Sequence, residues 1–376
     1  MSINKSLNGS IPRDGSKGTQ SPNATQPIAD LLSRGVPAGG GGSEDFIGYL
    51  RPDVIAEPLI NHWYAWSYLI PPATASRYLT QSQFKVMRSF IDSPEVHEAT
   101  LRDPAMMGGP FIHHPASRVD EVRSLLEETQ EKQSRLLGLS NAIAHLRTQL
   151  GNHPQGQSLE PLYDQIPEAL KGYVELVYDA NNNPSIRFIE GLLYRSEYYG
   201  PTSQSIALRI ADCDQRAFVM STPRLPDDNS LFLNIPFADP RLDQLFQLRH
   251  TAGPISEIAK LLNISTQALS FFYSLFIPST IPLDATFNCP PAANSVSPTD
   301  IRIRYLGHAC VLIETAEVSI LCDPLVSYEH VSTEDTPGMP RYTYADLPET
   351  IDYALITHNH QAHVKLETLL QLRHKI

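Results

Sequence analysis

The C-terminal part of this chain contains the segment Tyr353-Ala354-Leu355-Ile356-Thr357-His358-Asn359-His360-Gln361-Ala362-His363, which indicates its fold. A short apolar β-prone run is followed there by three histidines within six residues. On extended backbone, positions i and i+2 point the same way, so His358 and His360 can reach one point. His363 is expected at the start of a helix that includes residues 366–372, from which it can fold back. We therefore predict that His358, His360 and His363 bind a first-row transition metal such as zinc or iron.

The residues before this loop are rich in β-strand patterns. Strands are expected at residues 301–305, 311–315, 318–324 and 353–357. His308, within Gly307-His308-Ala309, is expected to shape a turn. Asp323 is expected to hydrogen-bond behind the metal ligands rather than to be a ligand itself. Cys310 is a weaker ligand candidate than the three histidines.

The composition excludes several classes of function. The chain has 29 Lys and Arg against 41 Asp and Glu, a net charge of -12, so we expect no nucleic-acid partner. No apolar run approaches the ~20 residues that span a bilayer, and residues 1–20 lack the apolar core of a secretory signal. The four cysteines are far apart, which favours reduced thiols in a cytoplasmic protein with no membrane contact. One structural disulfide is the alternative.

The chain divides into four parts by composition. Residues 1–44 are rich in Ser, Gly, Asn and Pro, and we expect a disordered tail. Residues 45–280 mix helical and strand patterns, which predicts an α+β domain. Residues 281–299 carry four prolines and many small residues, which indicates a linker. Residues 300–376 form the β-rich part that ends in the histidine loop.

Two segments within residues 45–280 have patterns that predict packing in a hydrophobic core. Residues 117–150 have apolar positions near helical spacing, with Ser117 as the expected N-cap and Gly138 as a possible break, and predict a helical hairpin. A dimerising helix is the alternative. The aromatic stretch 62–72 holds both tryptophans and predicts a core or a domain contact, with a ligand-binding wall as the alternative.

Residues 255–276 imitate a DNA-binding helix-turn-helix. The second helix has no Lys or Arg and is strongly apolar, so we expect a buried helical pair instead. Strand patterns at 172–178 and 185–189 around the turn 181–184 predict a hairpin. Further strands are expected at residues 205–210, 218–220 and 231–235.

Several stretches together resemble a known family. They are residues 51–58 (Arg-Pro-Asp-Val-Ile-Ala-Glu-Pro), 63–69 (Trp-Tyr-Ala-Trp-Ser-Tyr-Leu), 108–110, 196–199, 305–311 and 355–361. The chain resembles the diiron β-hydroxylases of natural-product biosynthesis, of the chloramphenicol type, and its histidines match the HxHxxH core of the metallo-β-lactamase superfamily. The resemblance implies an α+β N-terminal domain followed by a metallo-β-lactamase-type αββα domain with two irons. It also implies that O2 is used to hydroxylate the β-carbon of an amino acid bound to a peptidyl carrier protein of a nonribosomal peptide synthetase.

The sequence departs from the family pattern at the metal site. The family's aspartate in HxHxDH is replaced by Ala362, whose methyl group cannot bind a metal. Residues 300–376 match only the first part of the αββα domain, so we expect an incomplete domain, a truncated chain with impaired activity, or one complemented by a C-terminal partner chain. Two other functions stay open: a zinc hydrolase of the wider superfamily, and a non-catalytic module that docks a carrier protein or forms a homodimer.

Overall fold

The fold is known here from a computed structural model that describes residues 46–376 apart from 107, 211–219, 281–295 and 329–341. The expected tail 1–44, most of the expected linker 281–299 and two residues of the strand expected at 218–220 lie outside the described residues. Within the described part, no helix has the length and apolar character needed to cross a membrane.

An antiparallel sheet forms the centre of the N-terminal region. Its strands, in spatial order, are β3 (Trp63–Tyr64), β2 (Val54–Ile60), β6 (Gln204–Ile210) and β7 (Leu231–Leu233). Strand β2 is buried along nearly its whole length because both of its edges are paired and both of its faces are covered. The strands predicted at 205–210 and 231–235 are therefore confirmed, the second one with a shorter span.

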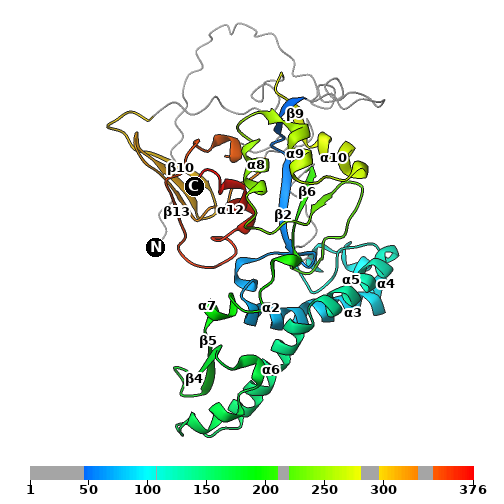
Figure 1. The fold of residues 1–376 in the computed structure, drawn as a ribbon, viewed down its shortest axis with the longest axis vertical. Coiled ribbons are helices and arrows are strands. Elements are labelled where there is room, and N and C mark those ends of the chain that lie inside the picture. The colour runs from blue at the N-terminus through cyan, green and yellow to red at the C-terminus, as the bar shows by residue number, and fades with distance from the viewer. Residues whose placement is uncertain (1–45, 107, 211–219, 281–295, 329–341) are drawn as a thin grey trace, which may run out of the picture. The chain divides into compact units, whose positions relative to one another are not determined.

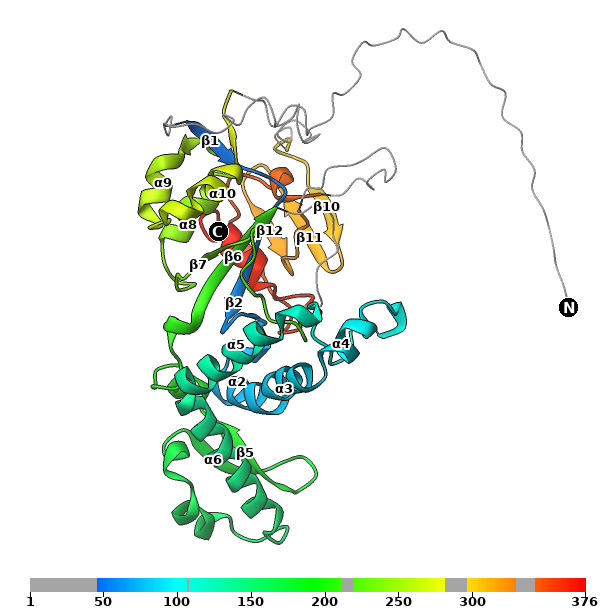
Figure 2. The ribbon, with the colours of Figure 1, turned by 90° about the vertical axis from the view of Figure 1, so that its right-hand side faces the viewer.

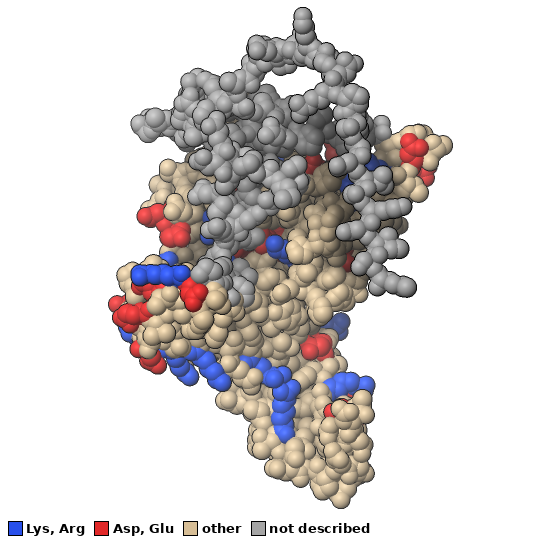
Figure 3. All heavy atoms as spheres, turned by 180° about the vertical axis from the view of Figure 1, so that it is seen from behind, with Lys and Arg blue, Asp and Glu red and all other residues tan. Residues whose placement is uncertain are grey.

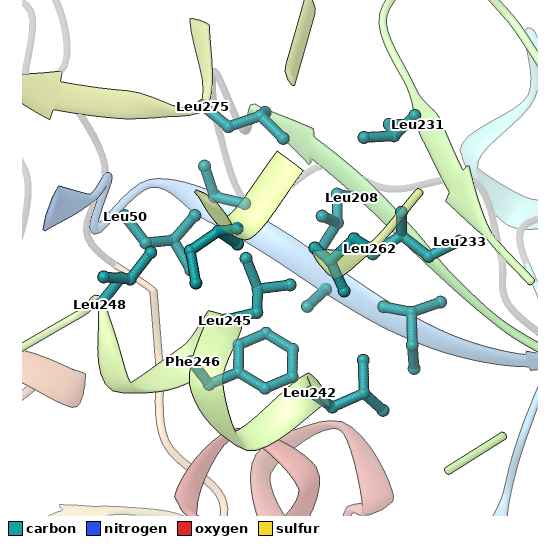
Figure 4. Close-up of a cluster of buried hydrophobic side chains, with 14 of the residues drawn as sticks. Leu50, Leu208, Leu231, Leu233, Leu242, Leu245, Phe246, Leu248, Leu262 and Leu275 are labelled. Carbon is teal, nitrogen blue, oxygen red and sulfur yellow. The ribbon is translucent and has the colours of Figure 1, made fainter. Parts of the chain in front are cut away.

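Short helices and a second small sheet pack on these strands. The elements are β1 (Ile47–Leu50), α8 (Arg241–Gln247), β8 (Gly253–Pro254), α9 (Ile255–Leu261), α10 (Leu269–Ser274) and β9 (Phe276–Pro278). Figure 4 shows Leu242, Leu245 and Phe246 of α8 gathered in one hydrophobic core with side chains from the strands and with Leu262, which follows α9. Ile255 and Phe272 are fully buried in the same core. The prediction that residues 255–276 form a buried helical pair, and not a DNA-binding helix-turn-helix, is thus confirmed.

The helices that follow β3 in the chain form a layer of their own. They are α2 (Pro72–Tyr78), α3 (Phe84–Asp92), α4 (Pro94–Thr100), α5 (Val119–Lys132) and α6 (Ser134–Gly151), with a π-helical turn at Leu79–Gln83. The helical prediction for 117–150 is confirmed, but Ser117 lies in a 3-10 turn without a capping hydrogen bond, and Gly138 lies inside α6.

The expected hairpin of α5 and α6 is wrong. Gln133, with φ -107° and ψ 24°, separates the two helices. Val122 and Leu126 of α5 pack into a core with α3, whereas Ile143 and Leu146 of α6 belong to a different core. Because the apolar stripe changes its partner at Gln133, each helix packs on a different neighbour.

The hairpin predicted around residues 181–184 is present. Strands β4 (Val174–Tyr178) and β5 (Pro184–Phe188) pair antiparallel, and Asn182 takes a φ of 60° in the turn. Asparagine tolerates this left-handed backbone better than most residues. Helix α7 (Glu190–Leu193) follows, and Leu176 and Ile186 of the hairpin pack with α6.

The C-terminal segment forms a sheet and one helix. Strands β10 (Arg302–Gly307), β11 (Cys310–Glu314), β12 (Ser319–Cys322) and β13 (Tyr353–Leu355) lie in that spatial order, followed by α12 (Leu366–Leu372). The strand patterns and the 366–372 helix predicted from the sequence are thus confirmed. Strands β12 and β13 are parallel, so both carry the chain toward the same edge of the sheet.

Helix α12 packs on the N-terminal region. It lies against β2 and α8, and Leu370 belongs to the N-terminal core. Arg373 donates to Asp243 Oδ1 at 2.7 Å and to the carbonyl of Asp239 at 2.8 Å. The packing of α12 therefore places the end of the histidine loop against the N-terminal region.

The described surface carries charges of both signs. On the face drawn in Figure 3, Lys and Arg lie in small groups interspersed with Asp and Glu. Some charged residues of the described part form ion pairs with near neighbours in the sequence, such as Arg118 with Glu121 and Arg102 with Glu98.

Candidate functional site

The three predicted histidines follow strand β13. The strand ends at Leu355, so His358 and His360 lie in the loop beyond it. His363 lies in a turn before α12, closed by hydrogen bonds from the amides of His363 and Val364 to the carbonyl of His360. Its expected position at the start of the helix is therefore wrong. This difference arises because the chain turns between the parallel strand and α12.

This loop brings the three imidazole rings together. The ring centroid of His358 lies 4.4 Å from that of His360 and 4.0 Å from that of His363. His358 and His360 are exposed, and His363 is half-buried. The sequence spacing thus predicted the proximity of the rings.

Asp323 holds the histidine loop through hydrogen bonds. It follows β12 and has a φ of 44°, and its amide donates to the carbonyl of Leu355 at 2.7 Å. Its buried carboxylate accepts hydrogen bonds from the amide of Thr357 at 2.8 Å, from the hydroxyl of Thr357 and from His363 Nδ1 at 2.9 Å. Burial acts to raise the pKa of Asp323, but the hydrogen bonds from Thr357 and His363 outweigh it and hold the pKa below its usual value.

These hydrogen bonds are compatible with one set of ring tautomers that suits metal binding. A carboxylate only accepts, so His363 Nδ1 carries the proton and its Nε2 keeps a lone pair. Thr357 gives its hydroxyl proton to Asp323 and can accept from His358 Nδ1 at 3.0 Å, which leaves His358 Nε2 with a lone pair. That lone pair accepts from His360 Nδ1 at 2.8 Å, so His360 Nε2 is also free of a proton. In this set of tautomers all three rings have an unprotonated Nε2, the form that binds metals.

The donor set fits one metal ion and not two. Three neutral imidazoles can bind one zinc or iron ion and leave positions for water or another ligand. A second ion needs further donors, and Ala362 supplies none. Among the described residues, no group of three or more His, Cys, Asp or Glu is already arranged around one metal-sized point. The hydrogen bond between His358 Nε2 and His360 Nδ1 is one reason, because an ion would have to replace it.

The loop is also held from the N-terminal region. Ser67 Oγ donates to Asn359 Oδ1 at 2.6 Å, between the first two histidines. Tyr64 donates to Glu367 Oε2 at 2.6 Å, and Glu367 is buried at the start of α12. The aromatic stretch 62–72 thus makes the contact between chain segments that the sequence predicted.

The weaker ligand candidates His308 and Cys310 are a turn residue and a core residue. His308 is exposed in the β10–β11 turn with a φ of 50°, as the turn prediction required. Cys310 is fully buried, and burial raises the pKa of its thiol to about 11, so the thiol stays protonated. Cys310 and Cys322 are both free thiols. Cys213 and Cys289 lie outside the described residues.

Sequence reasoning missed Thr357 and Ser67. Thr357 connects Asp323 to His358, and Ser67 contacts the loop from 292 positions away in the sequence. Because Thr357 directly precedes His358, its contact with that histidine could have been predicted from the sequence. No local pattern marks Ser67.

Comparisons with known proteins agree with these observations. Residues 49–279 match the diiron non-heme β-hydroxylase N-terminal domain, and residues 302–376 match the β-lactamase superfamily domain. A 4-amino-L-phenylalanyl-[CmlP-peptidyl-carrier-protein] 3-hydroxylase of Streptomyces venezuelae is 37% identical over 331 residues. This alignment covers 87% of this chain and 60% of the relative, so the chain spans less than two thirds of the relative's length.

Solved structures give the same relationship. The crystal structure of CmlA, a diiron β-hydroxylase from Streptomyces venezuelae, matches with a TM-score of 0.74 at 34% identity, over 88% of this chain and 60% of that one. A Glu-to-Asp mutant of CmlA matches with a TM-score of 0.73 at 35% identity, over 87% of this chain and 60% of that one. The chain has an N-terminal domain of this type followed by part of a β-lactamase-superfamily domain, and it belongs to the diiron non-heme β-hydroxylase family.

Proposed function

We propose that this chain takes part in hydroxylating the β-carbon of an amino acid that a peptidyl carrier protein holds as a thioester. Its family membership and the carrier-bound substrate of the Streptomyces venezuelae relative support this assignment. The observation that carries it is the clustering of three imidazoles on a loop anchored by Asp323. The proposal places the chain in nonribosomal peptide biosynthesis.

Within that function, His358, His360 and His363 bind one iron ion through their Nε2 atoms. Bound iron supplies the activation of O2 that a β-hydroxylase needs. Asp323 acts on the metal only through His363, whose proton it holds on Nδ1. Since Ala362 offers no carboxylate, this loop by itself binds a single ion.

Metal analysis tests this assignment. Purified chain is loaded anaerobically with Fe(II) or, separately, with zinc, and the bound metal is counted per chain. We expect one ion for the wild type and none for His363→Ala. His145→Ala, which removes an exposed histidine from α6, is the matched control and should retain the ion. Two irons per chain would mean that a homodimer or a complementing chain supplies further donors, and would overturn the single-ion assignment.

The carrier-protein partner needs a separate test. The N-terminal region, residues 46–280, is proposed to dock the aminoacyl carrier protein, whether or not the chain turns over. Isothermal titration of the full chain with an aminoacylated carrier protein should show saturable binding, and His363→Ala should bind equally well because that residue lies in the metal loop. Absence of binding to such carriers would contradict the docking role. Preferential binding of zinc over iron would instead favour a hydrolase, in which metal-bound water is the nucleophile.

A further inference from the structure

A cavity of about 260 Å³ lies in the N-terminal region. Its walls come from residues 60–70, helix α2, the junction of α5 with α6, and residues 197–204. Six aromatic side chains line it: Trp63, Tyr64, Trp66, Tyr78, Tyr198 and Tyr199. Its size is near the lower end of small-molecule sites, roughly 300 Å³. The predicted metal-binding histidines do not line it, so it is a different site.

Opposite charges lie among the residues that line this cavity. Arg135 Nε is 3.2 Å from Glu197 Oε2, and these side chains are 67% and 58% exposed. Exposed pairs of this kind contribute little to stability, so each partner can turn to a ligand at small cost. An α-amino acid carries a carboxylate and an ammonium group on one carbon. It can therefore replace this ion pair with two new ones, to Arg135 and to Glu197.

The walls also contain unsatisfied hydrogen-bond donors. Within the described part of the chain, Trp63 Nε1 and Trp66 Nε1 are buried without an acceptor. A buried donor without a partner costs free energy, which an acceptor on a bound molecule can offset. Aromatic walls with a few polar groups are typical of sites for aryl-bearing ligands.

One wall of the cavity is continuous with the metal loop. Trp66 lines the cavity, and its neighbour Ser67 donates to Asn359 between two of the histidines. The Trp66 ring also packs against Tyr64, with centroids 4.6 Å apart. Tyr64 in turn bonds Glu367 of α12. The cavity wall and the metal loop are therefore joined through Ser67 and Asn359.

We propose that this cavity binds a free aromatic α-amino acid, at a site separate from the metal loop. The aryl ring lies among the tryptophan and tyrosine side chains, the carboxylate pairs with Arg135, and the ammonium group pairs with Glu197. This inference goes beyond the proposed function and does not depend on it.

Tryptophan fluorescence tests the site directly, because both tryptophans of the chain line the cavity. Titration of the full chain with L-phenylalanine should give a saturable change in emission, and L-alanine should give none. Phenylalaninamide, which lacks the carboxylate, should bind roughly three- to fivefold more weakly, as expected for the loss of one exposed ion pair. Equal or tighter binding of phenylalaninamide would mean that a tethered acyl group, and not the free amino acid, is recognised, and would overturn the proposal.

Two variants with matched controls complete the test. Ala75→Phe fills the cavity from α2 and should abolish the fluorescence change, whereas Ala99→Phe on the exposed face of α4 should preserve it. If Ala75→Phe does not fold, Arg135→Gln gives the answer, since Arg135 is exposed. It should weaken binding of L-phenylalanine by the same three- to fivefold, while Arg102→Gln, at a comparable exposed pair, should not. Unchanged affinity in Arg135→Gln would refute the proposal even if the metal assignment holds.

Discussion

Replacing Asp323 with Asn should weaken metal binding at the histidine loop without unfolding the chain. Asn has nearly the same shape as Asp and tolerates the φ of 44° at this position. Its carbonyl oxygen can still accept from the amide of Thr357, which the wild-type carboxylate does at 2.8 Å. Its amide group, however, is a donor. A donor placed at His363 Nδ1 favours the tautomer with the proton on Nε2, which cannot bind a metal.

The expected magnitude follows from the contacts of Asp323. Loss of a hydrogen-bonding partner behind a metal-bound histidine lowers metal affinity by about 10- to 100-fold. This range corresponds to about 1.4–2.8 kcal/mol of binding free energy. We expect the upper part of the range because Asp323 also holds Thr357, which contacts His358 at 3.0 Å.

Zinc titration by calorimetry measures this effect, with circular dichroism as the check on folding. Asp352→Asn is the matched control, because Asp352 likewise accepts from a backbone amide and a hydroxyl, both of Ser319, at 2.8 and 3.0 Å. It contacts none of the three histidines. Equal zinc affinity in wild type and Asp323→Asn would refute the reasoning, and so would an equal loss in Asp352→Asn.

Three further predictions concern stability. In a urea titration, Arg224→Met should lower the free energy of unfolding by about 3–5 kcal/mol, because the buried Glu57 carboxylate loses the guanidinium that now lies 2.6 Å away. Arg187→Met, at an exposed ion pair, is the control and should lower it by at most about 1 kcal/mol. Arg373→Ala should lower the free energy of unfolding by about 1–3 kcal/mol, because charge-assisted hydrogen bonds are lost. Hydrogen exchange of backbone amides should increase in α12 before it increases elsewhere, and an equal increase along the whole chain would contradict this. His374 is half-buried, and the burial of its ring nitrogens lowers its pKa to about 4. Its neutral form therefore stabilises the fold above the unfolded pKa of about 6.5, and this contribution is lost as the pH falls toward 4. The urea midpoint of His374→Phe should consequently fall less between pH 7 and pH 4.5 than that of the wild type, and an equal fall would disprove the linkage.

Local patterns determined much of the secondary structure. The strand before the histidines, the 366–372 helix, the hairpin around residues 181–184 and the apolar pair at 255–276 are all found. Each depends on short-range periodicity or turn chemistry, which a single segment carries by itself. The break at Gln133 was not predicted, because both halves have a helical apolar stripe and only their different packing partners separate them.

The arrangement of the site depended on tertiary structure. The sequence alone predicted the three histidines, their proximity and the missing donor at Ala362. The hydrogen bond between Asp323 and Thr357, residues 34 positions apart, exists because β12 and β13 pair in parallel and end at one edge of the sheet. The contact of Ser67 with Asn359 and the aromatic cavity likewise need two distant segments to pack together. Sequence spacing decides which side chains can converge within one loop, whereas the contacts that orient them come from strands and helices far away in the chain.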